Sequence, residues 1–248
     1  MNYSTRIFIS FLCVILVLSQ APTSPIDAIG TVLPKFSDSA VSNYRAFNDL
    51  MKQSLPLVAY QLSSYGTVGR CWGSCSFPFI DNLTHKYPAE LPNRIWAAAE
   101  IPFLDKNDDG LLNQVFNVQF SGSGVVGVFQ TGMNITWNFS TGGQFTLKYT
   151  NQSLFVYIYN TDKNNPVKNI TILPASLGAN PPTFTTNFLN YLKPFNLLRT
   201  CFWQAQNLYN SGKQLQIWNN RTVLESSTQV SSNGVAFEHI LELENVTG

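Results

Sequence analysis

The segment NPVKNITILPASLGANPPTFTTNFLNYLKPFNLLRTCFWQAQN, residues 165–207, joins two different residue patterns. Before it, short runs alternate apolar and polar residues between glycines and asparagines, which is typical of short antiparallel strands. Near its end an apolar run, residues 195–202, is followed by an Asn- and Gln-rich loop and then by an amphipathic stretch. A strand followed by a helix is the beginning of a βα unit. The segment therefore predicts a junction between a β-domain and the first unit of an α/β domain.

Upstream of the junction the sequence predicts short strands at residues 114–120, 125–130, 133–139, 144–149, 154–160 and 169–173. Strands at this spacing predict an antiparallel β-sandwich of the jelly-roll type. In LFVYIYN, residues 154–160, both faces are apolar, so this strand is predicted to be central or covered on both sides. Four aromatic residues could either pack in the core or present flat rings to a sugar: Trp137, Phe139, Tyr157 and Tyr159.

Downstream of the strands, residues 184–192 and 234–246 repeat apolar side chains at helical spacing. Residues 195–202 supply the strand between these two helices. The expected fold class is therefore mainly β, an antiparallel β-sandwich followed by the first βα unit of a (β/α)8-type barrel. A complete barrel takes about 250 residues. The unit at 183–248 would thus be a barrel truncated early, or an appendage packed on the β-domain.

The N-terminal part has the pattern of an exported protein. Arg6 precedes an apolar run, residues 7–18, which is too short to cross a bilayer and has the length of a signal-peptide core. A secreted, extracellular protein is expected, with an uncleaved anchor as the alternative. The predicted divisions are a signal peptide at 1–21, a helix at 37–51 and loops within 22–100, the β-sandwich at 101–175, and the barrel start at 183–248.

Asn-x-Ser/Thr sequences agree with export, because such asparagines are glycosylation acceptors in secreted proteins. They begin at Asn82, Asn134, Asn138, Asn151, Asn169, Asn220 and Asn245. In an oxidising compartment Cys71 and Cys75, in CWGSC, are predicted to form a disulfide that closes a small loop, worth about 2 kcal/mol. Cys201 lies in the apolar run and is expected to be a buried, reduced side chain.

The 248-residue chain has a formal net charge of +1 and only 12% charged residues. Acidic and basic residues are mixed along it, without the basic stripe that nucleic acid or an anionic membrane surface attracts. Nucleic acid is therefore not an expected partner, nor is a membrane after removal of the signal peptide. Aromatic residues make up 13% of the chain. That content suits a secreted β-protein and also a sugar-binding one.

The spacing of Asp105, Asn107 and Asp109 before Gly110 is that of the first half of a calcium-binding loop. The residue at the twelfth position of such a loop is Phe116, where a bidentate glutamate would be required. A turn rich in Asp and Asn forms without metal. The expectation is therefore no cofactor, with calcium as the alternative.

Several motifs from residue 165 onward keep a fixed order. They are NP-V-x-N-I-x-I-x-P, F-L-x-x-L-K-P-F, L-R-x-x-x-W-x-x-x-N, W-x-x-R and GVAFEHILELEN. This order resembles a family of secreted proteins, described as cellulose-binding or glycoside-hydrolase-like, that join an N-terminal β-domain to a (β/α) barrel. The resemblance covers roughly residues 102–248. It implies that this chain is carbohydrate-associated.

Barrel active sites lie at the C-terminal ends of the strands. If the resemblance holds, the carbohydrate-binding candidates are Arg199, Trp203, Gln206, Asn207, Trp218 and Arg221. Aromatic faces stack on sugar rings while Arg and amide groups hold hydroxyls. Trp203 as a barrel plug and Arg199 as an ion-pair partner are the competing interpretation.

Glycoside hydrolysis needs two positioned carboxyl groups. Glu238 matches a glutamate of the family and is the candidate catalytic residue, but Phe202 stands where the family has an acid. Activity of these residues alone is therefore not expected. The leading hypothesis is a secreted β-sandwich that binds a polysaccharide and is joined to an incomplete hydrolase-like barrel. The alternatives are the N-terminal fragment of a polysaccharide-degrading hydrolase and a non-catalytic structural extracellular domain.

Overall fold

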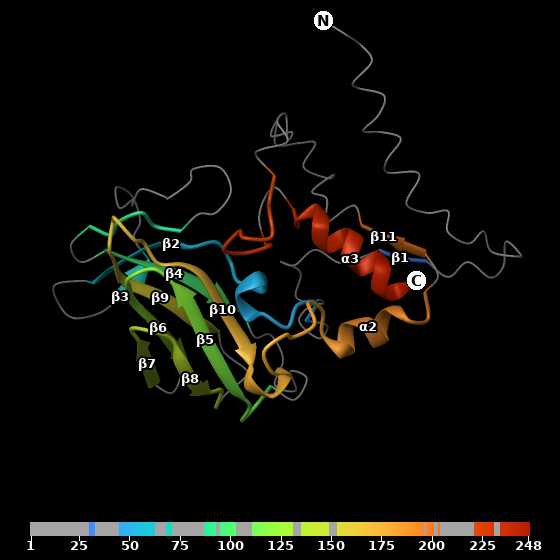
Figure 1. Cartoon of the computed structure of the whole chain (residues 1–248), viewed down its shortest axis with the longest axis horizontal. Coiled ribbons are helices and arrows are strands. Elements are labelled where there is room, and N and C mark those ends of the chain that lie inside the picture. The colour runs from blue at the N-terminus through green and yellow to red at the C-terminus, as the bar shows by residue number, and fades with distance from the viewer. Residues whose placement is uncertain are drawn as a thin grey trace, which may run out of the picture.

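A computed structural model of the chain describes residues 30–32, 45–62, 68–70, 87–92, 95–102, 111–130, 135–148, 153–195, 197–200, 203, 221–230 and 234–248. These residues form a mainly β protein with antiparallel sheets and two α-helices (Figure 1). None of the described helices is long and apolar enough to cross a bilayer.

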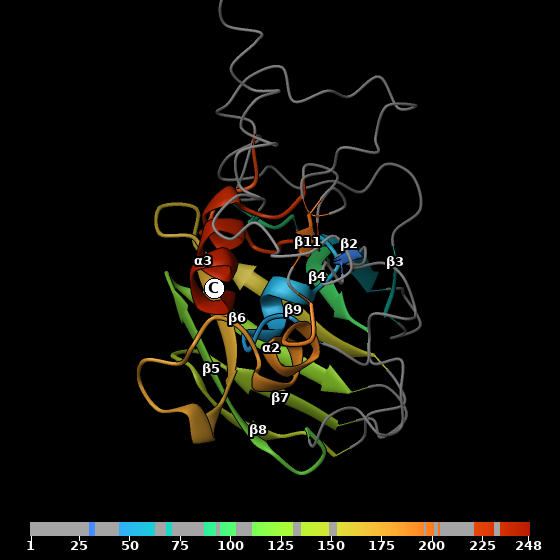
Figure 2. The ribbon, with the colours of Figure 1, turned by 90° about the vertical axis from the view of Figure 1, so that its right-hand side faces the viewer.

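Two antiparallel sheets form the β-domain. The larger has the order β3 (Val68–Arg70), β2 (Val58–Leu62), β4 (Ile95–Ile101), β9 (Leu154–Thr161), β6 (Gly124–Gln130) and β7 (Ile135–Phe139). The smaller has the order β10 (Lys168–Pro174), β5 (Val115–Ser121) and β8 (Gly143–Thr146). Figure 2 shows β5 and β8 on one side of the domain and β3 and β4 on the other.

The core of the β-domain lies between the two sheets. Val156 and Ile158 of β9 are fully buried there together with Phe116 of β5, whose ring stacks on Phe145 of β8 at 5.5 Å between centroids. Every second residue of β9 points into this core, because side chains alternate across a strand. The predicted two-layer, antiparallel arrangement of these strands is confirmed.

A second hydrophobic core lies beside the sandwich, where α2 (Thr186–Leu192) and α3 (Phe237–Thr247) appear in Figure 1. It contains Phe47, Phe188, Trp203 and Ile240 among other buried residues. Thr185 caps the start of α2, because its hydroxyl accepts a 3.2 Å hydrogen bond from the backbone N–H of Phe188. Both predicted C-terminal helices are therefore present in the described chain.

One short segment, residues 45–54, connects the two cores. Leu50 and Met51, in the 3-10 helix η2 (Leu50–Gln53), belong to the sandwich core, whereas Phe47 belongs to the second core. Asn48 donates to the carbonyls of Pro182 and Phe184, at 2.8 and 2.9 Å. We call this segment the strap, because some of its residues pack in the sandwich core and others pack in the second core.

The helix predicted at 37–51 is wrong over residues 45–49. There the backbone is extended enough for Phe47 to form an antiparallel bridge with Phe184. The side chain of Gln53 accepts from the N–H of Ala46 and donates to the carbonyl of Phe47, at 3.1 and 2.9 Å. These long-range and side-chain bonds take the place of helical ones, so tertiary contacts override the local period.

The six-stranded sheet begins earlier than the sequence predicted. β2, β3 and β4 all lie before residue 102, in stretches expected to be loops, and the boundary at 101 falls on the last residue of β4. β4 has the sequence IWAAAEI, and alanine has little strand propensity. Its Ala97 and Ala99 are buried in the core, so packing against the facing sheet determines this strand.

The strand predicted at 195–202 is shorter, and its partner was not foreseen. β11 (Leu197–Arg199) pairs in parallel with β1 (Gly30–Val32), from the N-terminal part of the chain. A barrel would instead pair this strand with that of the next βα unit. In this part of the chain the described residues show a parallel pair and two helices, and a barrel fragment is not shown. η3 (Ala175–Leu177) leads from β10 toward α2.

Candidate functional site

Six aromatic side chains lie together on the outer surface of the six-stranded sheet. Strand register places them there: Tyr60 pairs with Trp96, Phe129 pairs with Phe155, and Tyr157 faces Ala98. Directly paired residues of an antiparallel sheet share a face. This face is opposite to the one that packs in the sandwich core. We call the set the aromatic face: Tyr60, Trp96, Phe129, Phe155, Tyr157 and Tyr159.

The rings of the aromatic face form one connected array. Along β9, Tyr157 is nearly parallel to Phe155 and to Tyr159, with centroid distances of 6.0 and 5.8 Å. Trp96 meets the ring of Tyr159 edge-on at 4.6 Å, and Tyr60 meets that of Tyr157 edge-on at 5.8 Å. Only the central Tyr157 is buried, at 7% exposure, and the surrounding five rings are partly exposed. Edge-to-face and offset contacts of this kind hold each ring in place.

A glycine makes room for one of these rings. Gly127 of β6 lies opposite Tyr157, and a Cβ on it would be 2.1 Å from Cε2 of Tyr159. The ring of Tyr159 therefore lies across the backbone of the neighbouring strand at this point. Glycine inside a strand often marks such a close approach.

Polar groups are present within the aromatic face. Burial, followed by the nearby Tyr60, Tyr159 and Glu100 side chains, raises the pKa of Tyr157, so its hydroxyl keeps its proton. Burial also raises the pKa of Tyr159. A protonated phenol can both donate and accept a hydrogen bond. The face thus combines aromatic rings with hydroxyl groups, as a site for a polyhydroxylated ligand would require.

Trp203, a candidate from the sequence, is not part of this surface. It is 2% exposed, and its indole stacks on Phe188 at 5.8 Å and on Phe47 at 5.9 Å. Its carbonyl accepts from the N–H of Val235 at 2.7 Å, which ties it to the start of α3. Trp203 is therefore a residue of the second hydrophobic core, and other side chains pack against its ring.

The structure brings two other sequence candidates together. Arg221 donates to the carboxylate of Glu238 at 2.7 Å, and this ion pair connects the segment 221–230 with the first turn of α3. Although burial opposes ionisation of Glu238, a backbone hydrogen bond and Arg221 lower its pKa. A general acid of a glycosidase has a raised pKa instead. The contacts of Glu238 are therefore those of a structural ion pair at a helix N-terminus.

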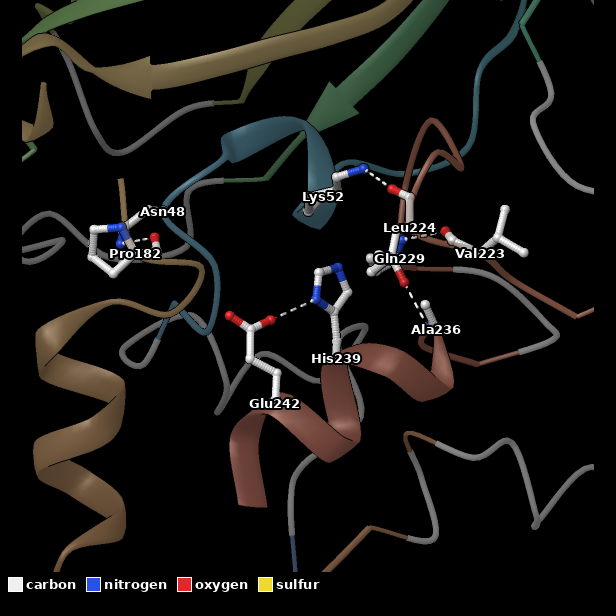
Figure 3. A network of polar contacts seen from close by, with 9 residues as sticks. All are labelled: Asn48, Lys52, Pro182, Val223, Leu224, Gln229, Ala236, His239 and Glu242. Atoms are coloured by element: carbon white, nitrogen blue, oxygen red, sulfur yellow. Dashed lines mark hydrogen bonds and ion pairs between the residues drawn. The ribbon is translucent and has the colours of Figure 1, made fainter. Parts of the chain in front are cut away.

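Beside this pair, polar groups fill the joint between the strap and α3 (Figure 3). Lys52 of η2 donates to the carbonyl of Leu224, and Gln229 donates to Val223 and accepts from the N–H of Ala236 at 3.0 and 2.7 Å. His239 of α3 lies 3.4 Å from Glu242 through Nδ1. Lys52 and Gln229 thus bind backbone groups of the same chain, and these contacts hold the strap, residues 221–230 and the start of α3 together.

Burial lowers the pKa of His239, and Lys52 lowers it further, although Glu242 and Glu238 act in the opposite direction. The ring packs against Phe47, with centroids 5.0 Å apart. Its other nitrogen, Nε2, is buried and has no hydrogen-bond partner among the described residues. His239 is therefore neutral in the folded protein at neutral pH. Within the described ranges no group of three His, Cys, Asp or Glu side chains could hold a metal ion.

Several predicted residues lie outside the described part of the chain. They are the signal peptide at 1–21, the cysteines Cys71, Cys75 and Cys201, the turn residues Asp105, Asn107 and Asp109, the candidates Gln206, Asn207 and Trp218, the side chain of Arg199, and the acceptors Asn82, Asn134, Asn151 and Asn220. Of the acceptor asparagines that are described, Asn138, Asn169 and Asn245 are exposed. Their glycosylation stays a prediction.

The sequence indicated part of the aromatic face. Tyr157 and Tyr159 were two of the four aromatic residues that could either pack in the core or present flat rings, and they lie on the outer face, whereas Trp137 and Phe139 point into the core. Tyr60 and Trp96 were not identified, because their strands were expected to be loops. The sequence gives no clear signal for Trp96, because alanine occupies both the inner positions and the outer position Ala98 of IWAAAEI.

No protein-family model matches the sequence, and no curated protein matches it. Among solved structures, the chain is similar over 50% of its length to the cupin domain of Cnp3 from Schizosaccharomyces pombe. It covers 90% of that domain, at 13% sequence identity and a TM-score of 0.18. At such a TM-score the likeness supports no conclusion about this chain.

Proposed function

We propose that this protein is a secreted, carbohydrate-associated protein whose β-sandwich binds a polysaccharide of the cellulose type through the aromatic face. The observation that carries the proposal is the array of partly exposed rings around Tyr157 on one surface of the sheet. Flat apolar rings suit the CH surfaces of sugars, and tyrosine hydroxyls suit their OH groups. The resemblance to cellulose-binding proteins supports the choice of ligand.

Fixed ring positions favour this function. Trp96 and Tyr60 meet the β9 rings edge-on, and the close approach of Tyr159 to Gly127 limits its movement. Rings that are already ordered lose little conformational entropy when a ligand binds. The low charge of the chain also suits an uncharged polymer, because no strong electrostatic field has to be neutralised.

Binding is proposed in preference to hydrolysis. The candidate carboxylate Glu238 is held by Arg221 in an ion pair, and its lowered pKa does not suit an acid that protonates a leaving group. Export rests on the apolar run at residues 7–18 and on the glycosylation acceptors, and belongs to the proposal.

The test is a pull-down of the secreted full chain on amorphous cellulose, with Trp96→Ala and Tyr159→Ala as binding-site variants. Loss of one stacking ring should lower affinity by about fivefold, since such contacts contribute of the order of 1 kcal/mol. Tyr191→Ala, which alters a partly exposed tyrosine of α2, is the matched control and is expected to bind normally. Equal binding of all three variants and the wild type would refute the aromatic face as the site.

A further inference from the structure

A carboxylate lies beside the aromatic face, on the same surface of the sheet. Glu100 is in β4, and strand register pairs it with Phe155 of β9 on the outer surface of the sheet. It lies on the same face as Trp96 and Ala98, because these residues alternate along one strand. Glu100 is also close enough to Tyr157 to raise the pKa of that tyrosine. A carboxylate thus lies on the same surface as the aromatic rings.

The carboxylate of Glu100 is oriented by its neighbour. The hydroxyl of Ser153, the residue that precedes β9, donates to Oε1 of Glu100. No described lysine or arginine forms an ion pair with Glu100. The side chain is partly exposed, so its second oxygen, Oε2, remains able to accept a hydrogen bond from a bound molecule. An ionised carboxylate accepts hydrogen bonds and cannot donate them.

We propose that Glu100 is the polar anchor of the polysaccharide site, and that it selects a chain with uncharged sugar units and free hydroxyl groups. Ligand hydroxyls donate to Oε2 of Glu100 while the sugar rings lie against Trp96 and the β9 aromatics. This inference rests on the proposed function and adds a specificity residue to it. The complementarity is one of charge and hydrogen bonding: hydroxyl donors are attracted, whereas a ligand carboxylate is repelled.

The geometry gives the carboxylate more influence than an isolated surface charge. It is next to rings that exclude water when a ligand covers them, and electrostatic interactions strengthen as the local dielectric constant falls. Hydrogen bonds to an ionised acceptor are stronger than those between neutral groups. Glu100 therefore affects which polymer binds, while the rings provide most of the contact area.

The experiment measures the retardation of the secreted full chain in native gels that contain one of three soluble polymers. Hydroxyethyl cellulose is neutral and offers hydroxyl donors, methylcellulose has most donors capped, and carboxymethyl cellulose carries negative charges. The variants are Glu100→Gln, which removes the charge and keeps the shape, and Glu90→Gln as a control at an exposed glutamate. Ser153→Ala removes the orienting hydroxyl but leaves the charge.

For Glu100→Gln we expect about fivefold to tenfold weaker binding to hydroxyethyl cellulose, because a neutral acceptor replaces a charged one. Binding to methylcellulose should change by less than about twofold, and binding to carboxymethyl cellulose should increase relative to the wild type. Glu90→Gln should match the wild type on all polymers. Ser153→Ala should keep the wild-type preference against carboxymethyl cellulose, which separates the charge effect from a disturbed strand.

Different experimental results would refute the proposed function and the proposed role of Glu100. If the wild type is retarded by none of the polymers and is not captured by amorphous cellulose, the proposed function is wrong and the role of Glu100 falls with it. If the wild type binds and Trp96→Ala weakens binding, but Glu100→Gln behaves as Glu90→Gln does, the aromatic site stands and the anchor is refuted. An equal loss on all three polymers would also refute the anchor, because it would indicate structural damage.

Discussion

The carboxylate of Asp49 accepts a hydrogen bond of 2.9 Å from the backbone N–H of Ile172, a residue 123 positions further along the chain. The same oxygen accepts from the N–H of Met51 at 3.0 Å and caps the 3-10 helix η2. One side chain thus fixes the strap and attaches it to β10. Burial raises the pKa of Asp49 to about 6, even though both hydrogen bonds and Lys52 act to lower it.

Asp49→Asn should make the protein more stable above pH 6 and should change its pH dependence. The pKa of Asp49 is raised from 3.8, so its contribution to stability is fully present below pH 3.8 and is lost as the pH rises through about 6. Asparagine keeps the accepting oxygen and does not ionise. The advantage of the variant should grow between pH 4 and 6, up to about 3 kcal/mol.

Urea denaturation at several pH values between 4 and 7 measures this effect. The free energy of unfolding of the variant minus that of the wild type is compared across pH, because the contributions of the other titrating groups cancel in this difference. Asp49→Ala, which removes the acceptor, should destabilise by about 1–3 kcal/mol at low pH. A variant Asp49→Asn whose advantage stays constant across this range would contradict the raised pKa.

His239→Gln should gain stability relative to the wild type as the pH falls, whereas Asp49→Asn gains it as the pH rises. Burial lowers the pKa of His239 from 6.5, so the neutral ring favours the folded state above pH 6.5. As the pH falls through 6.5, the unfolded chain takes up a proton that the folded chain does not, and stability is lost. The wild type should lose stability between pH 7 and 5 relative to the variant.

NMR titration checks this directly, because the chain has only 2 histidines, His85 and His239. The pKa of His239 should be below 6.5, and Glu242→Gln should lower it further by removing the carboxylate that faces Nδ1. A pKa of His239 at or above 6.5 in the wild type would show that its ring is open to water.

Trp203→Ala should destabilise the protein by about 3–5 kcal/mol, because it removes a large ring from a closely packed core. Trp203→Phe should cost less, since a smaller ring can still stack between Phe47 and Phe188. Binding of Trp203→Phe to amorphous cellulose should be unchanged. Reduced binding at normal stability would instead place Trp203 in the ligand site, as the family resemblance implied.

Gly127→Ala should weaken polysaccharide binding without unfolding the protein. The new Cβ would lie 2.1 Å from the ring of Tyr159, so the ring has to move away from β6. The double variant Gly127→Ala with Tyr159→Ala should bind no more weakly than Tyr159→Ala alone, because both changes act on the same ring. Additive losses in polymer binding would mean that Gly127 acts by another route.

Much of the β-domain could be predicted because its signals are local. The alternation in residues 154–160 predicted a strand, and it also separated Val156 and Ile158 from Tyr157 and Tyr159, although which face would be the core remained open. The apolar spacing at 184–192 and 234–246 likewise predicted α2 and α3, within a few residues of their observed ends. Such signals depend only on residues that are close together in the sequence.

The candidate site was only partly predictable, because it is assembled from strands that are distant in the sequence. Trp96 and Tyr60 meet the β9 rings only through the pairing of β2 with β4 and of β4 with β9. Ala97 and Ala99 gave no clear strand signal. Their small side chains are buried because the opposite sheet packs closely on them, and this contact is invisible in a local sequence window.

By itself, then, the sequence determined the periods of the strands and helices, the turns between them and the alternation of the β9 aromatics, because each depends on residues close in the chain. The tertiary structure alone decided that β9 turns Tyr157 outward, that β11 pairs with Gly30–Val32, and that Asp49 joins the strap to Ile172. Register, burial and hydrogen bonding between distant segments are set by how complete surfaces fit together, and that fit is a property of the folded chain.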